Sequence, residues 1–128
     1  MNINRILIVD DHEDFRKTVE GFLKKFPTVE VVGEASDGEE AIQKVESLMP
    51  DIVLMDIAMP HCSGLEATRL IKQKWPNVKV IITTTFEYPI YKFQATEVKA
   101  DDYILKRSLK ADLEKRFRVI GSTRAGKE

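Results

Sequence analysis

Short apolar runs alternate with longer amphipathic segments along the whole chain. The runs cover residues 5–9, 29–35, 51–55, 78–84 and 102–105. Several of them are apolar on both faces, which is typical of parallel strands that are covered by helices above and below. The segments between the runs carry apolar residues at helical spacing and predict helices around Phe15, Val19, Phe22, Leu23 and Phe26, around Ala41, Val45, Leu48 and Met49, around Ala67, Leu70 and Ile71, and more weakly from about Ile90 to Glu97.

Turn-forming residues stand where these predicted helices should begin and end. Pro27, Pro50 and Pro76 follow the first three helices, and proline cannot continue a helix. Asp37-Gly38 precedes the second helix and Ser63-Gly64 precedes the third, as residues that cap helix N-termini do. The turn residues and the periodicity therefore agree on a repeating strand-helix unit.

Five such units predict an α/β fold, a doubly wound (βα)5 sandwich with a five-stranded parallel sheet. Right-handed crossovers place helices on both faces of such a sheet. In open parallel sheets the binding crevice lies beyond the carboxyl ends of the strands. We therefore expect the functional residues at the ends of the predicted strands.

The totals are those of one globular domain. At 128 residues, with 43% hydrophobic and 32% charged residues, the chain is long enough for one core but not for a second domain. No apolar run approaches the roughly 20 residues of a membrane-spanning helix, and the first residues lack the pattern of a secretory signal. We therefore expect a cytoplasmic protein without a membrane partner. With one cysteine, Cys62, and two histidines, His12 and His61, we expect neither an internal disulfide nor a zinc cluster.

The charge is distributed unevenly. From Lys106 to Glu128, eight Lys or Arg residues stand against three Asp or Glu, so the preceding residues carry a net charge of −6 within a total of −1. A cation or a cationic partner would bind in the acidic part. The basic part predicts an amphipathic last helix with a solvated basic face rather than a DNA-binding surface, because its apolar residues recur at helical spacing, at Leu109, Leu113, Phe117 and Ile120.

Polar residues follow four of the predicted strands. Asp10 and Asp11 end the first, Asp56 ends the third, Thr83-Thr84-Thr85 ends the fourth, and Lys106 follows the fifth. Each has an ordinary structural interpretation when it is taken alone. Asp11 could cap the first helix, Asp56 could be a turn residue, Thr84 a strand former and Lys106 a surface charge.

Taken together, these side chains predict a site for a metal ion and a phosphoryl group. Three carboxylates held close together repel one another, and a divalent ion removes that conflict. Oxygen ligands without thiolate or imidazole suit Mg²⁺, which usually shares its coordination shell with waters and a phosphate. A carboxylate beside Mg²⁺ can attack phosphorus to give an aspartyl phosphate, while Lys and Thr bind the phosphoryl oxygens.

Five separate stretches of the sequence resemble the receiver domains of bacterial two-component response regulators. In chain order they are ILIVDDHEDFR, VVGEASDGEEAI, PDIVLMDIAMPHCSGLEATRLIK, VIITTTFE and ADDYILK. The style of the motifs is most similar to that of regulators that continue into a helix-turn-helix DNA-binding domain. The resemblance implies the flavodoxin-like strand order 2-1-3-4-5, a receiver domain over residues 1–120, and a polar tail or the start of a linker over 121–128.

Carried over position by position, the resemblance implies that Asp56 is the phosphoacceptor. Mg²⁺ would be bound directly by Asp11 and Asp56. Asp10 would act on the metal through a water, and the backbone carbonyl of Ala58 would complete the protein's share of the coordination shell.

Three further residues match the part of the family's site that responds to phosphorylation. Lys106 would contact the phosphoryl group, and the spacing of 22 residues between Thr84 and Lys106 selects Thr84 as the hydroxyl that moves toward it. Tyr103 matches an aromatic that swings inward when the threonine moves; the alternative is a half-buried strand aromatic that keeps its rotamer. In the loop after the phosphoacceptor, Pro60 would shape the backbone and Gly64 would open the third helix.

Two positions depart from the family's pattern. Val98-Lys99-Ala100 stands where the family usually has a small residue followed by Gly and Ala. Lys99 either adopts the left-handed conformation at a cost of about 1 kcal/mol, or the fourth helix ends differently. Arg107 replaces a proline that often follows the family's lysine. All the acidic and phosphate-contacting positions are kept, which speaks against a receiver that cannot be phosphorylated.

The resemblance implies a phosphorylation switch rather than an enzyme that turns over a substrate. A sensor histidine kinase, or a small phosphodonor, would phosphorylate Asp56 in a Mg²⁺-dependent reaction, and the surface of the fourth helix, fifth strand and fifth helix would then change. The output would be transcription, with DNA bound only by an output domain outside this chain, or else protein–protein contacts of a stand-alone receiver. A homodimer through that surface or another face is a further expectation.

Two other classes of protein share part of the pattern. A hydrolase with an aspartyl-phosphate intermediate would show Asp-x-Asp after the first strand, whereas here Asp10 and Asp11 are adjacent and Asp56 is followed by Ile57 and Ala58. A flavodoxin-like or dinucleotide-binding module would need a Gly-rich phosphate loop after the first strand, and carboxylates at that place repel a pyrophosphate.

Overall fold

The sheet has the predicted strand order. The computed structural model describes residues 3–59 and 62–118 of the chain. Five parallel strands form one sheet in the order β2-β1-β3-β4-β5. The strands are β1 (Asn4–Val9), β2 (Val29–Ala35), β3 (Ile52–Asp56), β4 (Lys79–Thr84) and β5 (Asp102–Leu105).

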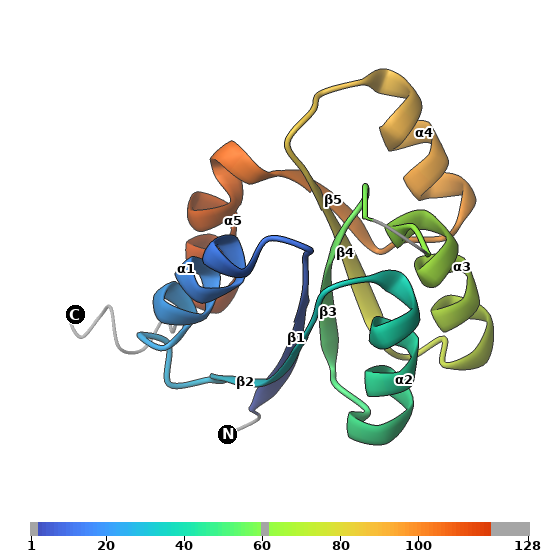
Figure 1. Cartoon of the computed structure of the whole chain (residues 1–128). Helices are drawn as coiled ribbons and strands as arrows, with labels where there is room; N and C mark the ends of the chain where they lie inside the picture. Colours follow the sequence, from blue (N-terminus) through green and yellow to red (C-terminus); the bar gives the residue numbers. More distant parts are fainter. Residues whose placement is uncertain (1–2, 60–61, 119–128) are drawn as a thin grey trace.

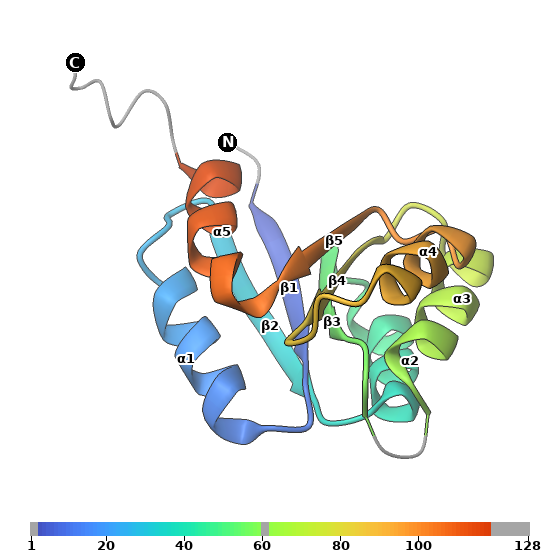
Figure 2. The same ribbon diagram turned by 90° about the horizontal axis from the view of Figure 1, so that it is seen from above.

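The helices cover both faces of this sheet. They are α1 (Glu13–Leu23), α2 (Gly38–Leu48), α3 (Gly64–Lys74), α4 (Pro89–Glu97) and α5 (Leu109–Phe117), with a short 3₁₀ turn, η1 (Lys106–Ser108), before α5. α1 and α5 lie on one face, and α2, α3 and α4 lie on the other (Figures 1 and 2). The doubly wound α/β fold expected from the sequence is therefore confirmed.

Alternation along the central strands divides the hydrophobic core into two layers. Successive strand residues point to opposite faces. Leu7 and Val53 pack toward α2, α3 and α4, whereas Ile8 and Leu54 pack toward α1 and α5. Burial of one such side chain contributes roughly 1.5–3 kcal/mol. The two layers hold β1 and β3 in the middle of the sheet and so fix where their carboxyl ends lie.

The beginnings of α2 and α3 follow the predicted capping residues. The Asp37 side chain accepts a hydrogen bond from the Glu40 N–H at 2.8 Å, and Ser63 Oγ accepts one from the Glu66 N–H at 3.2 Å. The capping role considered for Asp11 is wrong, because the N-cap of α1 is His12 and its side chain makes no capping bond. Instead, Asp10 Oδ1 accepts from the His12 N–H at 2.9 Å.

Two helix ends differ from the periodicity. α1 ends at Leu23, although Phe26 is still buried, because a tighter turn after the helix directs the Phe26 ring against Phe22 and Phe117. α5 ends at Phe117, and the predicted helical residue Ile120 lies outside the described residues, as does the predicted tail over 121–128.

Lys99 adopts the left-handed conformation, which decides between the two alternatives for the end of α4. Its φ is 67°. The Lys99 N–H donates to the Thr96 carbonyl and the Ala100 N–H donates to the Ala95 carbonyl, both at 3.0 Å. This pair of bonds is a Schellman motif, in which glycine is the usual residue at the left-handed position. Lys99 therefore keeps the backbone geometry of a glycine without being one.

None of the helices in the described ranges is long and apolar enough to cross a membrane.

Candidate functional site

The carboxyl ends of the strands bring the predicted site residues to one edge of the sheet. Asp10 directly follows β1, Asp56 is the last residue of β3, Thr84 is the last residue of β4, and Lys106 directly follows β5. The Cα partners at the ends of β3 and β4 are Asp56 and Thr83, so the neighbouring strands end at nearly the same level.

Lys106 joins two buried carboxylates. Its Nζ lies 2.6 Å from Asp10 Oδ2 and 3.4 Å from Asp56 Oδ1. The side chains of Asp10 and Asp56 are only 1% and 7% exposed, and that of Lys106 is 15% exposed. The Lys106 Nζ also lies 4.3 Å from the centroid of the Phe15 ring, in a cation–π contact. The ammonium group is therefore fixed between the ends of β1 and β3.

The surroundings of Asp56 favour the protonated form of its carboxyl group. Burial is the largest cause, and the charge of Asp10 adds to it, so the pKa of Asp56 rises from 3.8 to about 6 although Lys106 lowers it. Two buried carboxylates with one ammonium between them thus leave negative charge uncompensated. A further cation at this edge would relieve it.

Asp11 and His12 stand at the open side of this pair. The Asp11 side chain is 30% exposed and that of His12 is 71% exposed, and His12 Nδ1 lies 3.1 Å from both Asp10 Oδ1 and Asp11 Oδ1. Potential ligand atoms of Asp10, Asp11 and His12 all lie within 4.8 Å of one another. From the sequence, His12 was considered only as a possible zinc ligand. Its contacts with the two carboxylates were not predicted, although its position directly after Asp11 indicated them.

These residues suit a Mg²⁺ ion. Most of the potential ligand atoms are carboxylate oxygens, which Mg²⁺ prefers. The single positive charge of Lys106 does not balance the two buried carboxylates of Asp10 and Asp56. Asp56 does not belong to the group of Asp10, Asp11 and His12, whose ligand atoms lie within 4.8 Å of one another. It is connected to this group by Lys106, which contacts both Asp10 and Asp56. Ala58 is exposed and follows two residues after Asp56, at the place where a carbonyl ligand is predicted.

Thr84 and Tyr103 lie beside the site and are bonded to the loop after β4. Thr84 is 1% exposed, and its Oγ1 accepts from the Phe86 N–H at 3.2 Å. Tyr103 is half-buried, and its hydroxyl donates to the Phe86 carbonyl at 3.4 Å. Burial raises the pKa of Tyr103, and the charge of Glu87 adds to this. Both predicted switch residues are therefore hydrogen-bonded to Phe86 in the loop after β4.

Gly64 holds the start of α3 against the end of β3. Its N–H donates to the Ile57 carbonyl at 3.1 Å, and a Cβ at this position would lie 1.8 Å from the Asp56 carbonyl oxygen. The prediction that Gly64 opens the third helix is confirmed, and the close approach explains why only glycine fits. Pro60 lies outside the described residues.

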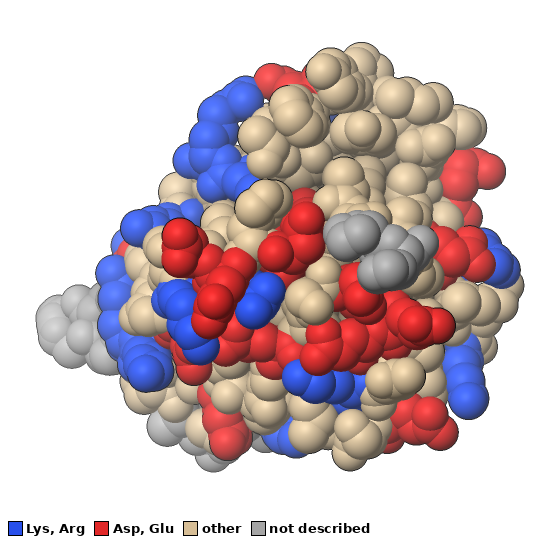
Figure 3. Space-filling view, viewed as in Figure 1, with Lys and Arg blue, Asp and Glu red and all other residues tan. Residues whose placement is uncertain are grey.

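Charge and apolar surface separate on the face that Figure 1 shows. Asp and Glu atoms gather across the middle of this face, and Lys and Arg atoms are more frequent toward α1 and α5 (Figure 3). The part over α4 is largely uncharged (Figure 3). Ile90 and Phe93 of α4, and Phe86 and Tyr88 just before it, are large hydrophobic side chains that are about half exposed or more.

Known proteins are similar to this chain in sequence and in fold. The family model for the response regulator receiver domain matches residues 6–118. The transcriptional regulatory protein DegU of Brevibacillus brevis is 41% identical over 102 residues, which are 80% of this chain and 43% of DegU. The response regulator protein VraR of Staphylococcus aureus is 39% identical over 109 residues, 85% of this chain and 52% of VraR. The chain thus spans about half the length of these relatives.

A solved structure of similar size shares the whole fold. The response regulator domain of Thermotoga maritima CheB superposes with a TM-score of 0.83 at 33% sequence identity. The match covers 91% of this chain and 95% of that domain.

Proposed function

This chain belongs to the response regulator receiver family, and we propose that it is a phosphorylation switch whose phosphoacceptor is Asp56. The observation that carries the proposal is the placement of Lys106, whose ammonium group lies between the buried carboxylates of Asp10 and Asp56 at the carboxyl edge of the sheet. A fixed cation beside a buried carboxylate is the arrangement that a transferred phosphoryl group needs.

In the proposed reaction, a carboxylate oxygen of Asp56 attacks the phosphorus of the donor, which is a phosphohistidine of a sensor histidine kinase or a small phosphodonor. The bond from phosphorus to the donor breaks as the bond to Asp56 forms, and the product is an acyl phosphate. Lys106 pairs with the added phosphoryl oxygens, and it is already within 3.4 Å of Asp56.

A Mg²⁺ ion would be held by Asp11 and Asp56 directly, by Asp10 through a water, and by the Ala58 carbonyl. When bound, it would neutralise the charge that accumulates between the carboxylates and the phosphoryl group. The excess negative charge of the buried pair and the oxygen-rich donor set support this assignment.

The proposed response begins with Thr84. Its hydroxyl donates to the Phe86 carbonyl at 3.5 Å, and it would turn this O–H to a phosphoryl oxygen instead, so that the loop after β4 follows. Tyr103 then loses its bond to the Phe86 carbonyl and turns inward, which shifts the population toward an active state. A cavity of about 440 Å³ between the start of α4, β5 and the start of α5 has Tyr88, Lys92 and Tyr103 in its wall, so its shape would change.

We propose that this α4-β5-α5 face carries the output, including contacts with a second copy of the chain or with another protein. The exposed apolar residues along α4 support a surface that binds a partner. By analogy with DegU and VraR, the output would be control of transcription in the cytoplasm, with DNA bound by an output domain beyond the receiver. The chain would assist its own phosphorylation and dephosphorylation without acting as a general hydrolase.

Intact-mass measurement after incubation with acetyl phosphate and Mg²⁺ tests the proposal. We expect the wild type to gain one phosphoryl group and Asp56→Asn to gain none. Asp51→Asn is the matched control, because Asp51 precedes the same strand at its opposite, exposed end. An unmodified wild type, or equal modification of Asp56→Asn, would contradict the proposal. Sustained turnover of a generic phosphate ester would favour the hydrolase class instead.

A further inference from the structure

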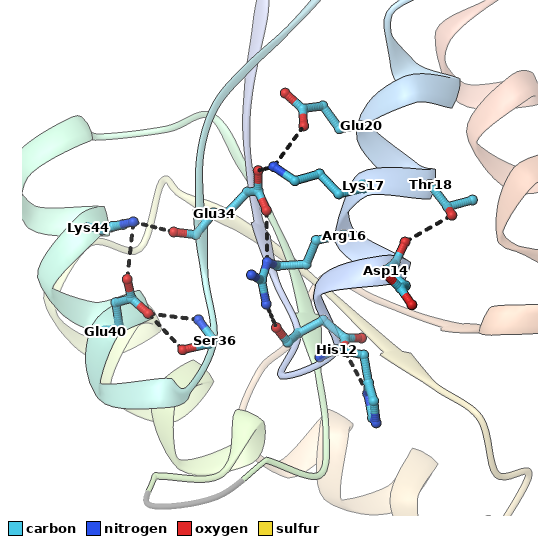
Figure 4. Close-up of polar contacts among 11 residues, drawn as sticks. His12, Asp14, Arg16, Lys17, Thr18, Glu20, Glu34, Ser36, Glu40 and Lys44 are labelled. Carbon is cyan, nitrogen blue, oxygen red and sulfur yellow. Dashed lines mark hydrogen bonds and ion pairs between the residues drawn. The ribbon is translucent and has the colours of Figure 1, made fainter.

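Arg16 connects the acidic turn after β1 to the neighbouring strand β2. Its Nε donates to Glu34 Oε1 at 2.8 Å, and its Nη1 donates to the backbone carbonyl of Asp10 at 2.7 Å. Figure 4 shows the Arg16 side chain extending from α1, with its guanidinium group between Glu34 and the turn that carries His12. The Arg16 and Glu34 side chains are only 15% and 22% exposed.

The guanidinium group is divided between two partners instead of making one ion pair. Elsewhere on the surface, Arg69 binds Glu66 with two nitrogens, at 3.2 Å and 2.5 Å. That two-pronged geometry is the stronger and more usual one for an Arg–carboxylate pair. Arg16 instead donates only its Nε to Glu34, and it donates its Nη1 to the Asp10 carbonyl. An ion pair that served stability alone has no reason to divide in this way.

Glu34 is a firm anchor for the guanidinium group. It lies on β2 opposite Ile8 of β1, next to the strand that ends in the acidic pair. Lys17 also binds its carboxylate at 3.2 Å, and Lys44 of α2 donates to its backbone carbonyl (Figure 4). The Arg16 hydrogen bond, followed by that of Lys17, holds the pKa of Glu34 below its usual range. The carboxylate therefore stays charged and in place.

The carbonyl that Arg16 binds belongs to the peptide that joins Asp10 to Asp11. The other polar groups of Asp10 have partners: its N–H donates to the Ala35 carbonyl, and its carboxylate binds Lys106 and the His12 N–H. Fixing the carbonyl fixes the plane of this peptide, and hence the direction in which the Asp11 side chain leaves the backbone. Without Arg16, this carbonyl would lose its bond to the guanidinium group, while the Asp10 side chain would stay bound to Lys106 and the His12 N–H.

We propose that Arg16 is a positioning residue, held by Glu34, that orients Asp11 for the divalent cation. The inference rests on the proposed function, because it concerns the same metal site. Partners of this kind around metal ligands typically account for a 10- to 100-fold difference in metal affinity. Lysine cannot replace Arg16, because one ammonium group has no planar fork with which to bridge Glu34 and the Asp10 carbonyl.

The test compares Mg²⁺ affinity with phosphorylation at saturating Mg²⁺, using the whole chain. For Arg16→Lys we expect the Mg²⁺ dissociation constant, measured by calorimetry, to rise about tenfold. We also expect acetyl phosphate to modify Asp56 at nearly the wild-type rate once Mg²⁺ is saturating. Glu34→Gln keeps the shape of the anchor and removes its charge, so it should weaken Mg²⁺ binding in the same direction by a smaller factor.

Arg69→Lys is the matched control, because it changes an Arg–Glu pair that does not touch the site. Its Mg²⁺ affinity should equal that of the wild type. Wild-type Mg²⁺ affinity in both Arg16→Lys and Glu34→Gln would overturn this inference alone, and so would an equal loss in Arg69→Lys. A slow rate that saturating Mg²⁺ does not restore would also overturn it. A wild type that neither binds Mg²⁺ nor becomes phosphorylated would overturn the proposed function itself.

Discussion

Thr84 and Tyr103 are hydrogen-bonded to the backbone of the same residue, Phe86. Thr84 Oγ1 accepts from its N–H at 3.2 Å, and the Tyr103 hydroxyl donates to its carbonyl at 3.4 Å. Thr84 ends β4 and Tyr103 lies within β5, so one loop residue connects two neighbouring strands. Thr84 Oγ1 also donates to the Phe86 carbonyl, at 3.5 Å. If Thr84 moves toward Asp56, as we propose, Phe86 loses its bonds to Thr84, and its bond to Tyr103 connects the change to β5.

Replacing Thr84 by valine should uncouple Tyr103 from the site. Valine keeps the shape of threonine but lacks the hydroxyl, so the variant should lose about 0.5–1.5 kcal/mol of stability. In the wild type, beryllofluoride with Mg²⁺ should shift the amide resonances of both Phe86 and Tyr103. In Thr84→Val the shift at Tyr103 should fall to less than half.

Thr96→Val controls for the loss of a threonine hydroxyl, because Thr96 donates to the Lys92 carbonyl on the exposed side of α4. This variant should respond as the wild type does. An undiminished Tyr103 shift in Thr84→Val would show that the coupling does not pass through the Thr84 hydroxyl.

The sequence predicted which residues meet at one edge of the sheet, because their positions depend on the strand ends. The apolar residues before Asp10 and Asp56 have only one stable place, in the middle of a sheet covered on both faces. Parallel strands then bring their carboxyl ends to one edge, whichever helices surround them. The contact of Lys106 with Asp10 and Asp56 follows from this topology, although the residues are far apart in the chain.

Features that depend on local backbone geometry or on tertiary contacts could not be predicted from the sequence. The cap of α1 fell on His12 instead of Asp11, because Asp10 turns its carboxylate back to the His12 N–H. The contact between Arg16 and Glu34 exists only because β2 lies beside β1. Periodicity identifies which face of a helix is buried, but it does not show which polar partner a long side chain will reach.

Replacing Gly64 by alanine should destabilise the protein strongly. The new methyl group would lie 1.8 Å from the Asp56 carbonyl oxygen, so either β3 or the start of α3 has to move. We expect a loss of about 2–4 kcal/mol in the free energy of unfolding, measured by urea denaturation. Phosphorylation of Asp56 should also slow, because the movement displaces the end of β3.

Gly21 offers the matched substitution. It lies within α1, and a Cβ there would meet nothing within 4 Å. Gly21→Ala should therefore stabilise the protein by about 0.5–1 kcal/mol through helix propensity. If Gly64→Ala were as stable as Gly21→Ala, the close approach at Asp56 would not be a real constraint.

Replacing Lys99 by glycine should stabilise the protein, which is the reverse of the usual effect of glycine. Lys99 has a φ of 67°, where a residue with a Cβ is strained and glycine is not. Part of the gain is offset by the greater freedom of glycine in the unfolded chain, so we expect a net increase of about 0.5–1 kcal/mol by thermal denaturation. Lys92→Gly, at an exposed position inside α4, should instead lose about 1 kcal/mol. Equal losses in both variants would contradict the strain at Lys99.

Replacing Asp56 by asparagine should stabilise the metal-free protein at neutral pH but not in acid. The pKa of Asp56 is raised from 3.8 to about 6, so between these values the folded state binds more protons than the unfolded state. Stability therefore falls as the pH rises through this window, and the full cost of the buried charge is present above the folded pKa. A shift of this size corresponds to a penalty on the order of 2–3 kcal/mol, which asparagine avoids.

Urea denaturation in EDTA measures this difference in the free energy of unfolding. The gain of Asp56→Asn should be present at pH 8 and mostly absent at pH 4. Mg²⁺ should then stabilise the wild type more than the variant and narrow the difference at pH 8. Asp51→Asn controls for the amide substitution itself, and a gain of Asp56→Asn that is the same at pH 4 and pH 8 would contradict a buried, titrating Asp56.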